Sequence, residues 1–351
     1  MTPIARIQKP RALRPGDTVA AVSLSWGGPG MFPHRYAIGK EQFVREFGVN
    51  VVESRHALSD PDWLARHPQA RAADLMEAFA DPSIHGIIST IGGDDSIRLL
   101  PYLDLAVIAN NPKVFLGYSD TTVSHVACYR AGLVSFYGPS VMAGFGENGG
   151  MFRYMVDSLR RTCFSPTPVG DLTPNTDGWT VEHLDWSNPD NQNRRRTLSP
   201  STGWRFLQGH GCIRGRLFGG CLEVLDWLRG TSVWPEPESL EGMLLFLETS
   251  EEVPSPQTVT RMLRSLAAVG VLERAQGLMF GRPGGQSTVP HEIYDDAIRR
   301  VVVSEERLHD FPIVAGMDFG HTDPMFVLPY GVMAEIDCDA QRVRIVENAV
   351  V

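Results

Sequence analysis

Residues 114–131 read VFLGYSDTTVSHVACYRA, an apolar run that passes through Gly-Tyr-Ser-Asp directly into a helical pattern. The run over residues 114–117 predicts a buried strand, and residues 120–131 predict the helix that follows it. The same alternation on the N-terminal side predicts strands over 17–24, 51–52 and 86–90 and helices over 35–47 and 70–79. Strands that alternate with helices predict a doubly wound parallel α/β sheet, in which the working residues lie at the carboxyl ends of the strands.

The C-terminal part of the sequence returns to a regular pattern at about residue 211. It predicts helices over 222–228, 256–268 and 293–303, strands over 244–248 and 277–281, and a β-hairpin formed by 332–337 and 343–347. We therefore expect two α/β domains, residues 1–166 and residues 211–351.

Residues 167–210 separate these two domains and lack a regular pattern. The segment is rich in Pro, Asn, Asp, Thr and Ser, and it contains Trp179, Trp186 and Trp204. A long segment with little secondary structure is usually a disordered linker or a functional lid. Because disordered segments contain few aromatic residues, the tryptophans favour a lid over a linker.

The composition is that of an ordinary globular protein and excludes several classes of function. The 351 residues are 43% hydrophobic and carry a net charge of -9, which repels a phosphate backbone and disfavours nucleic acid as a partner. No run reaches the roughly 18 apolar residues of a membrane helix, and the N-terminus lacks the apolar core of a signal peptide. We expect a cytoplasmic protein with no membrane partner.

The sequence gives little support for a metal or a cofactor. The five cysteines form no Cys-x-x-Cys pair, and His210-x-Cys212 has no partner pair, so a disulfide framework or a zinc site has no support. The early loop over residues 26–30 lacks the Gly-x-Gly-x-x-Gly spacing, and no Gly-Lys-Ser/Thr loop occurs. We expect reduced thiols, no metal and no cofactor.

Ser119 is the candidate nucleophile. It stands where the predicted strand meets the helix, a turn that lifts a hydroxyl out of a sheet and points a helix N-terminus toward it. The Gly-x-Ser-x-Gly pattern is incomplete, since Thr121 occupies the second glycine position. A serine or aspartate at this place is also a common helix N-cap, so the motif alone leaves both interpretations open.

Gly92 and Gly93 follow another predicted strand. Paired glycines allow backbone N–H groups to approach a substrate oxygen closely, as an oxyanion hole requires. A plain turn is the alternative.

Further along the chain, Glu248 closes an apolar run and His321 lies in a glycine-flanked turn. We hypothesise that Ser119, Glu248 and His321 converge as nucleophile, orienting carboxylate and base.

Six ordered blocks of sequence now make a family resemblance specific. The chain resembles the LD-carboxypeptidase family of serine peptidases over nearly its whole length. The blocks lie within residues 13–17, 92–104, 117–120, 215–220, 245–248 and 319–331.

The resemblance implies a Ser-Glu-His triad at Ser119, Glu248 and His321, the residues already selected, with the backbone N–H groups of Gly93 and Asp120 as oxyanion donors. It further implies a Rossmann-like N-terminal layer, a swivelling β/α or barrel-like C-terminal domain, and a homodimer without metal. The implied activity is that of a serine carboxypeptidase that cleaves an amide-type bond next to a terminal unit.

The long interval between Ser119 and Glu248 is similar to the interval in the microcin-immunity branch of the family. In that branch an inserted loop stacks an aromatic ring on a nucleobase. Trp186 is the first candidate for this role and Trp179 the second; the alternative is that they only attach the loop to the body. Two departures concern the substrate: Cys221 replaces an expected asparagine, and in the acidic run 249–252 Glu252 replaces a lysine and would repel an anionic group.

The expected substrate is an aminoacyl or peptidyl nucleotide, or a related acyl sulfamoyl adenylate, hydrolysed for self-immunity or detoxification. A murein tetrapeptide carboxypeptidase that releases terminal D-alanine is the alternative enzyme. A non-catalytic protein that binds a peptide or nucleotide in the same cleft is the alternative from another class.

Overall fold

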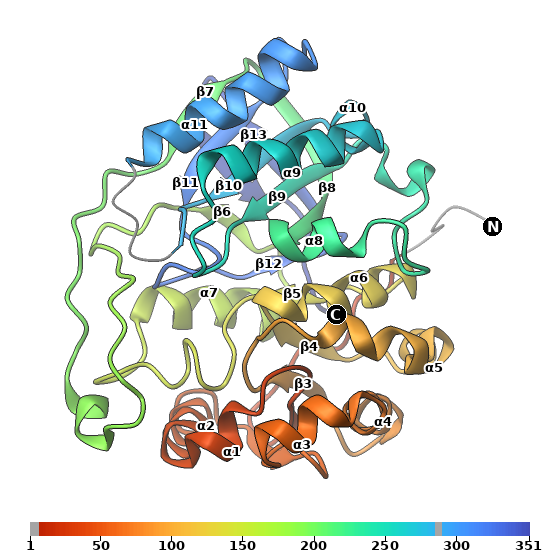
Figure 1. Ribbon diagram of the computed structural model, residues 1–351, viewed down its shortest axis with the longest axis vertical. Helices are drawn as coiled ribbons and strands as arrows, with labels where there is room; N and C mark the ends of the chain where they lie inside the picture. The colour runs from red at the N-terminus through yellow and green to blue at the C-terminus, as the bar shows by residue number, and fades with distance from the viewer. Residues whose placement is uncertain (1–6, 285–289) are drawn as a thin grey trace.

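The computed structural model describes residues 7–284 and 290–351, and its strands form two sheets stacked one above the other (Figure 1). The lower sheet has six strands in the order β12-β5-β4-β3-β1-β2. Its strands are β1 (Thr18–Val22), β2 (Asn50–Glu53), β3 (Gly86–Ser89), β4 (Val114–Gly117), β5 (Phe136–Tyr137) and β12 (Leu328–Pro329).

The five N-terminal strands are all parallel, as the sequence predicts for a doubly wound sheet. The chain moves from β1 outward to β2 and then back across β1 to β3, so the direction of winding reverses next to β3. The helices of this lobe are α1 (Gly28–Met31), α2 (Pro33–Phe47), α3 (Pro61–Arg66), α4 (Pro68–Ala80), α5 (Leu105–Asn110), α6 (Thr122–Arg130) and α7 (Arg153–Cys163), with short 3-10 helices η1 (Ser96–Tyr102) and η2 (Ser119–Thr121).

The upper sheet has eight strands in the order β6-β14-β13-β8-β9-β10-β11-β7. They are β6 (Gly170–Leu172), β7 (Arg205–Gln208), β8 (Cys212–Cys221), β9 (Leu244–Glu248), β10 (Gly277–Gly281), β11 (Ile313–Met317), β13 (Met333–Asp337) and β14 (Arg342–Ile345). The central run β8-β9-β10-β11 is parallel, and the remaining pairs are antiparallel.

The helices of the upper lobe cover one face of this sheet in Figure 1. They are α8 (Leu222–Leu228), α9 (Pro256–Ala268), α10 (Val271–Arg274) and α11 (His291–Arg299), with short helical turns η4 (Pro237–Leu240) and η5 (Arg300–Glu305). Ser255 explains the start of α9, because its hydroxyl accepts the Thr258 N–H at 3.1 Å and proline follows it at the first helical position. None of the helices in the described ranges has the length and apolar character needed to cross a membrane.

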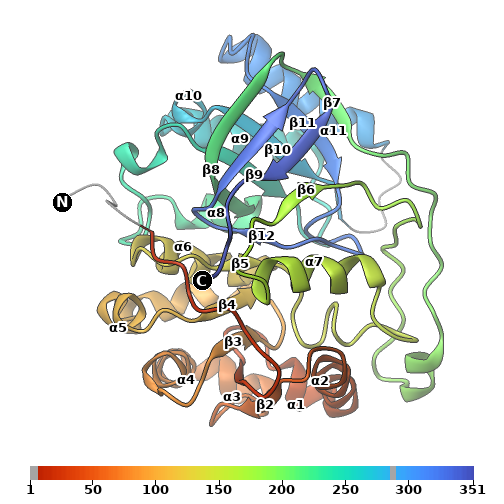
Figure 2. The same cartoon turned by 180° about the vertical axis from the view of Figure 1, so that it is seen from behind.

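Residues 167–210 contain more regular structure than their sequence predicts. Strands β6 and β7 lie at opposite edges of the upper sheet, and in the sequence they are separated by the short helix η3 (Pro189–Asn193). Both strands are short and at most partly apolar, so no clear alternation marks them in the sequence. Figures 1 and 2 show the intervening chain running along one side of both lobes before it returns.

One hydrophobic core connects the two sheets. Phe136 of β5, Phe246 of β9 and Tyr330, which follows β12, belong to the same buried cluster. Strand β12 strengthens this connection, because it comes from the C-terminal part of the chain and pairs antiparallel with β5 of the lower sheet. Residues from both lobes are therefore held at fixed positions near the carboxyl ends of β4 and β9.

Candidate active site

Ser119 lies in a strained turn between β4 and η2. Its φ is 61°, a left-handed conformation that costs a residue with a side chain on the order of 1–3 kcal/mol. Its backbone N–H donates to the Tyr137 hydroxyl at 3.1 Å. A Cβ on Gly117 would lie 2.8 Å from the Thr121 methyl carbon, so glycine at 117 makes room for the threonine that interrupts the expected motif.

Gly92 lies directly beside the candidate nucleophile. A Cβ built on Gly92 would stand 2.9 Å from Ser119 Oγ and 3.6 Å from the backbone nitrogen of Asp120. Gly93 has a φ of 146°, and a Cβ there would lie 2.3 Å from Ser25 Oγ. Because neither glycine has a side chain, Ser25 can approach the backbone at Gly93, and the space beside the Ser119 hydroxyl stays open at Gly92.

The two loops that follow β3 and β4 are joined through Asp120. Its buried carboxylate accepts the backbone N–H groups of Asp95 at 3.0 Å and Ser96 at 2.8 Å, and the Ser96 hydroxyl donates to the Asp120 carbonyl at 2.7 Å. Burial raises the pKa of Asp120, and these hydrogen bonds partly offset that effect. Among the described residues, neither the Gly93 N–H nor the Asp120 N–H donates a hydrogen bond. The two N–H groups that the family resemblance implies as oxyanion donors are therefore not engaged by the described part of the chain.

Glu248 and His321 are in direct contact. Glu248 closes β9 with no exposed surface, and its Oε2 lies 2.7 Å from His321 Nδ1. Its Oε1 accepts a short hydrogen bond from the Tyr137 hydroxyl. A Cβ on Gly320 would lie 2.4 Å from Glu248 Oε2, so glycine before the histidine allows this close approach.

Tyr137 connects the two halves of the site. Its hydroxyl accepts from the Ser119 N–H and donates to Glu248, which in turn holds His321. Burial and the charge of Glu248 raise the pKa of Tyr137 well above its ordinary value, so the hydroxyl keeps the proton that it donates. A chain of hydrogen bonds therefore links the Ser119 backbone N–H to Glu248 and His321, whereas no hydrogen bond joins the Ser119 hydroxyl to His321 in the described part of the chain.

The second ring nitrogen of His321 meets a carboxylate that the sequence reasoning did not select. Nε2 lies 2.9 Å from Oε2 of Glu251, on the loop after β9. Burial would lower the pKa of His321, but the carboxylates of Glu248 and Glu251 outweigh burial and raise that pKa well above its ordinary value. The acidic run 249–252 was the available signal, but spacing alone could not show which glutamate faces the ring.

Glu252 is exposed, and its backbone N–H approaches Ser250 Oγ at 3.3 Å. The loop that carries both glutamates is attached through Ser250, whose N–H donates to Glu223 Oε1 at 2.8 Å. Cys221 is buried beside it, with its thiol 3.5 Å from Glu223 Oε2. The two departures from the family pattern thus lie close to one loop.

The candidate stacking residues Trp186 and Trp179 lie against different lobes. The Arg35 guanidinium of α2 lies 4.8 Å from the Trp186 ring centroid. The Arg282 guanidinium, next to β10, lies 4.9 Å from the ring centroid of Trp179. Both rings are half-buried, so each contributes to the attachment of the segment to the body.

The segment around these tryptophans is tied to the loop that carries His321. Thr180 and Asp323 form a bridge through two backbone hydrogen bonds of 2.8 and 3.0 Å. The Arg196 side chain pairs with Asp323 at 2.7 Å and also with buried Glu147. Movement of this segment would therefore be transmitted to the turn of His321.

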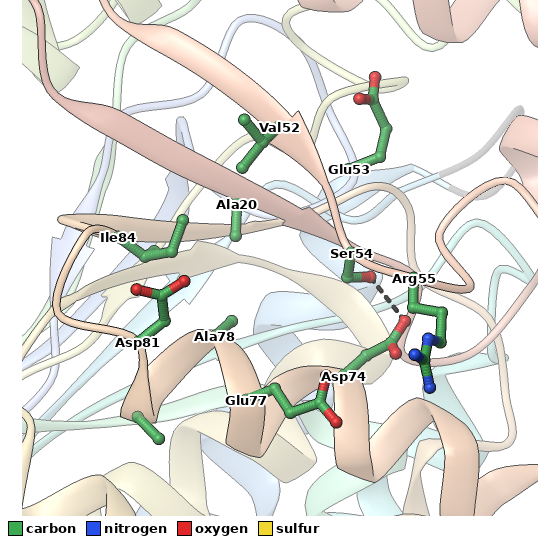
Figure 3. Close-up of a pocket in the computed structure, with 11 residues that line it drawn as sticks. Ala20, Val52, Glu53, Ser54, Arg55, Asp74, Glu77, Ala78, Asp81 and Ile84 are labelled. Carbon is green, nitrogen blue, oxygen red and sulfur yellow. Dashed lines mark hydrogen bonds between the residues drawn. The ribbon is translucent and has the colours of Figure 1, made fainter.

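A separate hollow of 510 Å³ lies between β2 and α4 (Figure 3). Acidic side chains line it, including Glu53, Asp74 and Glu77, and the Ser54 hydroxyl donates to Asp74 at 2.7 Å. None of the residues around Ser119 or His321 lines this hollow. Glu53 pairs with Lys40, and Asp74 accepts from Ser54 and from the His56 backbone N–H, so these two carboxylates are already engaged.

The chain matches two family models. The model described as LD-carboxypeptidase N-terminal domain matches residues 19–138, and the model described as LD-carboxypeptidase C-terminal domain matches residues 214–336. The microcin C7 self-immunity protein MccF of Escherichia coli is 31% identical over 342 residues, which cover 95% of this chain and 94% of that protein.

Solved structures agree over both lobes. An MccF-like protein from Streptococcus pneumoniae in complex with AMP has a TM-score of 0.86 and 31% identity, covering 95% of this chain and 99% of that one. MccF in complex with aspartyl sulfamoyl adenosine has a TM-score of 0.81 and 28% identity, covering 98% of this chain and all 100% of that one. The expected fold class, a parallel N-terminal sheet with a second α/β lobe, is confirmed. On these matches, the chain belongs to the LD-carboxypeptidase family.

Proposed function

We propose that this protein is a serine carboxypeptidase in which Ser119, Glu248 and His321 form the catalytic triad. The observation that carries the proposal is the hydrogen-bonded chain from the Ser119 turn through Tyr137 to the 2.7 Å contact between Glu248 and His321. A strained serine, a histidine and a buried carboxylate are the parts that nucleophilic acyl transfer requires, and this chain positions the serine through its backbone N–H.

Each group has a defined task in this reaction. Ser119 Oγ attacks the scissile carbonyl while His321 Nε2 accepts its proton, and Glu248 stabilises the resulting imidazolium. The N–H groups of Gly93 and Asp120 hold the oxyanion, and one such donor contributes about 10²–10³ in rate. His321 returns the proton to the leaving group, and water then releases the acyl group from Ser119 by the same route.

The proposed substrate is an aminoacyl or peptidyl nucleotide or an acyl sulfamoyl adenylate, hydrolysed for self-immunity or detoxification. The similarity to MccF, which has been solved with aspartyl sulfamoyl adenosine, and to an MccF-like protein solved with AMP supports this class. Trp186 is proposed to stack on the nucleobase, since it lies on the lobe that carries Ser119. A stacked base contributes roughly 1–3 kcal/mol.

The test is product mass spectrometry on the wild-type protein and the Ser119→Ala variant, each incubated separately with aspartyl sulfamoyl adenosine and with an L,D-linked murein tetrapeptide. We expect serine-dependent cleavage of the nucleotide. Cleavage of the tetrapeptide alone would assign the protein to cell-wall recycling instead. Binding of either compound without cleavage, together with no adduct of Ser119 with a fluorophosphonate, would identify a non-catalytic binding protein.

A further inference from the structure

We propose that Glu251 is a latch on His321: in the substrate-free protein its carboxylate occupies the nitrogen that must accept the serine proton, and the substrate has to displace it. This inference rests on the proposed function, because it assigns His321 the role of general base. Its structural basis, the contact between Glu251 and His321, is independent of any substrate.

The geometry leaves His321 without a free lone pair. Nδ1 lies 2.7 Å from Glu248 and Nε2 lies 2.9 Å from Glu251. A carboxylate only accepts hydrogen bonds, so both ring nitrogens act as donors and the ring is an imidazolium. A general base needs an unprotonated nitrogen within about 2.6–3.2 Å of the proton it abstracts. The latched arrangement is therefore a resting state that cannot activate Ser119.

The two carboxylates differ in how firmly they are held. Glu248 is on a central strand with no exposed surface, and Tyr137 donates to its second oxygen. The Glu251 side chain is 72% exposed and lies on a loop, two residues before Val253, whose φ is 54°. A rotation of the Glu251 side chain can therefore release Nε2 and leave the contact between Glu248 and His321 intact.

The other ionisable groups around His321 are neutral or already paired. Tyr118, whose ring centroid lies 5.0 Å from that of His321, is buried, and burial raises its pKa. On the histidine's own loop, Asp323 pairs with Arg196. Arg282, which approaches Thr322 at 3.4 Å, pairs with Asp318 at 2.8 Å. Glu248 and Glu251 are thus the carboxylates that set the charge state of the ring in the described part of the chain.

The latch makes the nucleophile dependent on pH in a defined direction. Below the raised pKa of His321 the ring is cationic and holds Glu251, so Ser119 is not activated. As the pH rises through that pKa, the ring loses a proton and the ion pair weakens. Removal of the charge at 251 should lower the pKa of His321 and extend activity toward lower pH. Glu248 still raises that pKa, so the shift is partial.

The experiment compares wild-type protein with Glu251→Gln and a control, Glu273→Gln, which removes an exposed charge on α10. The rate at which a fluorophosphonate modifies Ser119 is measured from pH 5 to pH 9, with Ser119→Ala as the blank. We expect Glu251→Gln to move the midpoint down by about one pH unit, which corresponds to roughly tenfold faster labelling on the acidic side. The Glu273→Gln profile should coincide with that of the wild type.

A second measurement does not depend on catalysis. The ring nitrogens of His321 are titrated by NMR in the same proteins, with the signals assigned from His321→Asn. A lower His321 pKa in Glu251→Gln supports the latch, and so does a lower His321 pKa in Glu251→Asp, which keeps the charge but moves it away from the ring. This support holds even if the fluorophosphonate labels no protein, because absent labelling would reject only the proposed function. An unchanged His321 pKa in both variants, with labelling profiles that coincide with the wild type, overturns the latch.

Discussion

The two lobes supply the parts of the site in different ways. In the lower lobe, Ser119 and Gly92 are positioned by the backbone, through a φ of 61° and a close approach that leaves no room for a side chain. In the upper lobe, Glu248 and His321 are positioned by side-chain charges at 2.7 Å. Backbone positioning follows from short local motifs, whereas charge pairing needs residues that lie 73 positions apart in the chain. The lower half of the site is therefore more visible in the sequence than the upper half.

Removal of the reacting side chain from either lobe should produce the largest effect. Ser119→Ala and His321→Ala should each reduce kcat by about 10⁴–10⁶, and the double variant should be little worse, because the two groups act as a unit. Ser265→Ala serves as the control, because this half-buried serine of α9 donates only to the Arg261 carbonyl of its own helix. The measurement is kcat on aspartyl sulfamoyl adenosine. Losses that multiply in the double variant would show that the lobes act independently.

A substitution that fills the space beside Ser119 tests the lower-lobe part of the site, which the backbone positions, separately from the upper-lobe part. Gly92→Ala places a methyl group 2.9 Å from Ser119 Oγ, where it would move the substrate carbonyl away from the N–H groups of Gly93 and Asp120. It should lower kcat by about 10²–10³, a loss of the size that one missing oxyanion donor causes. Circular dichroism should show an unchanged fold. Near-normal turnover in this variant would mean that the carbonyl does not bind between Gly92 and Ser119. Gly211→Ala, where an added Cβ meets no atom within 4 Å but φ is 62°, shows how much backbone strain alone costs when a glycine is lost.

Cutting the connection between the lobes should have an intermediate effect. Tyr137→Phe removes the acceptor of the Ser119 N–H and the donor to Glu248. A hydrogen bond to a charged group contributes about 1.5–3 kcal/mol, so we expect a loss of roughly 10- to 150-fold in kcat/KM. Tyr154→Phe, whose hydroxyl donates to the Thr173 carbonyl outside the site, is the matched control. Equal activity in both variants would show that Tyr137 does not couple the lobes.

Substitution of the tryptophans should have the smallest effect, and it tests which lobe binds the nucleobase. Trp186→Ala should raise KM for the nucleotide by about tenfold with little change in kcat, since a stacked base contributes roughly 1–3 kcal/mol. Trp179→Ala, on the other lobe, should change KM less. The reverse order would move the nucleobase to the Arg282 side of the site, and equal small changes in both would leave the tryptophans as attachments of the segment.

Much of the fold could be predicted where a local pattern was strong. Helices over 222–228 and 256–268 and the strand over 277–281 have the predicted bounds, because apolar periodicity and caps are local properties. Helix α7 (Arg153–Cys163) and strand β11 (Ile313–Met317) were missed. So were the two-residue strands β5 and β12: β5 is defined by its pairing with β4 and β12, and β12 by its pairing with β5 across the lobes.

The sequence by itself determined the alternating α/β class, the glycine-flanked turns, the three residues proposed as the triad and, through its ordered blocks, the family. Only the tertiary structure decided that β6 and β7 of the segment over residues 167–210 close the two edges of the upper sheet, and that Tyr137 joins the lobes. It also decided that Glu251, and not its neighbour Glu252, contacts His321. Local patterns set φ angles and helix ends, but contacts between distant residues depend on how loops lie over a shared core.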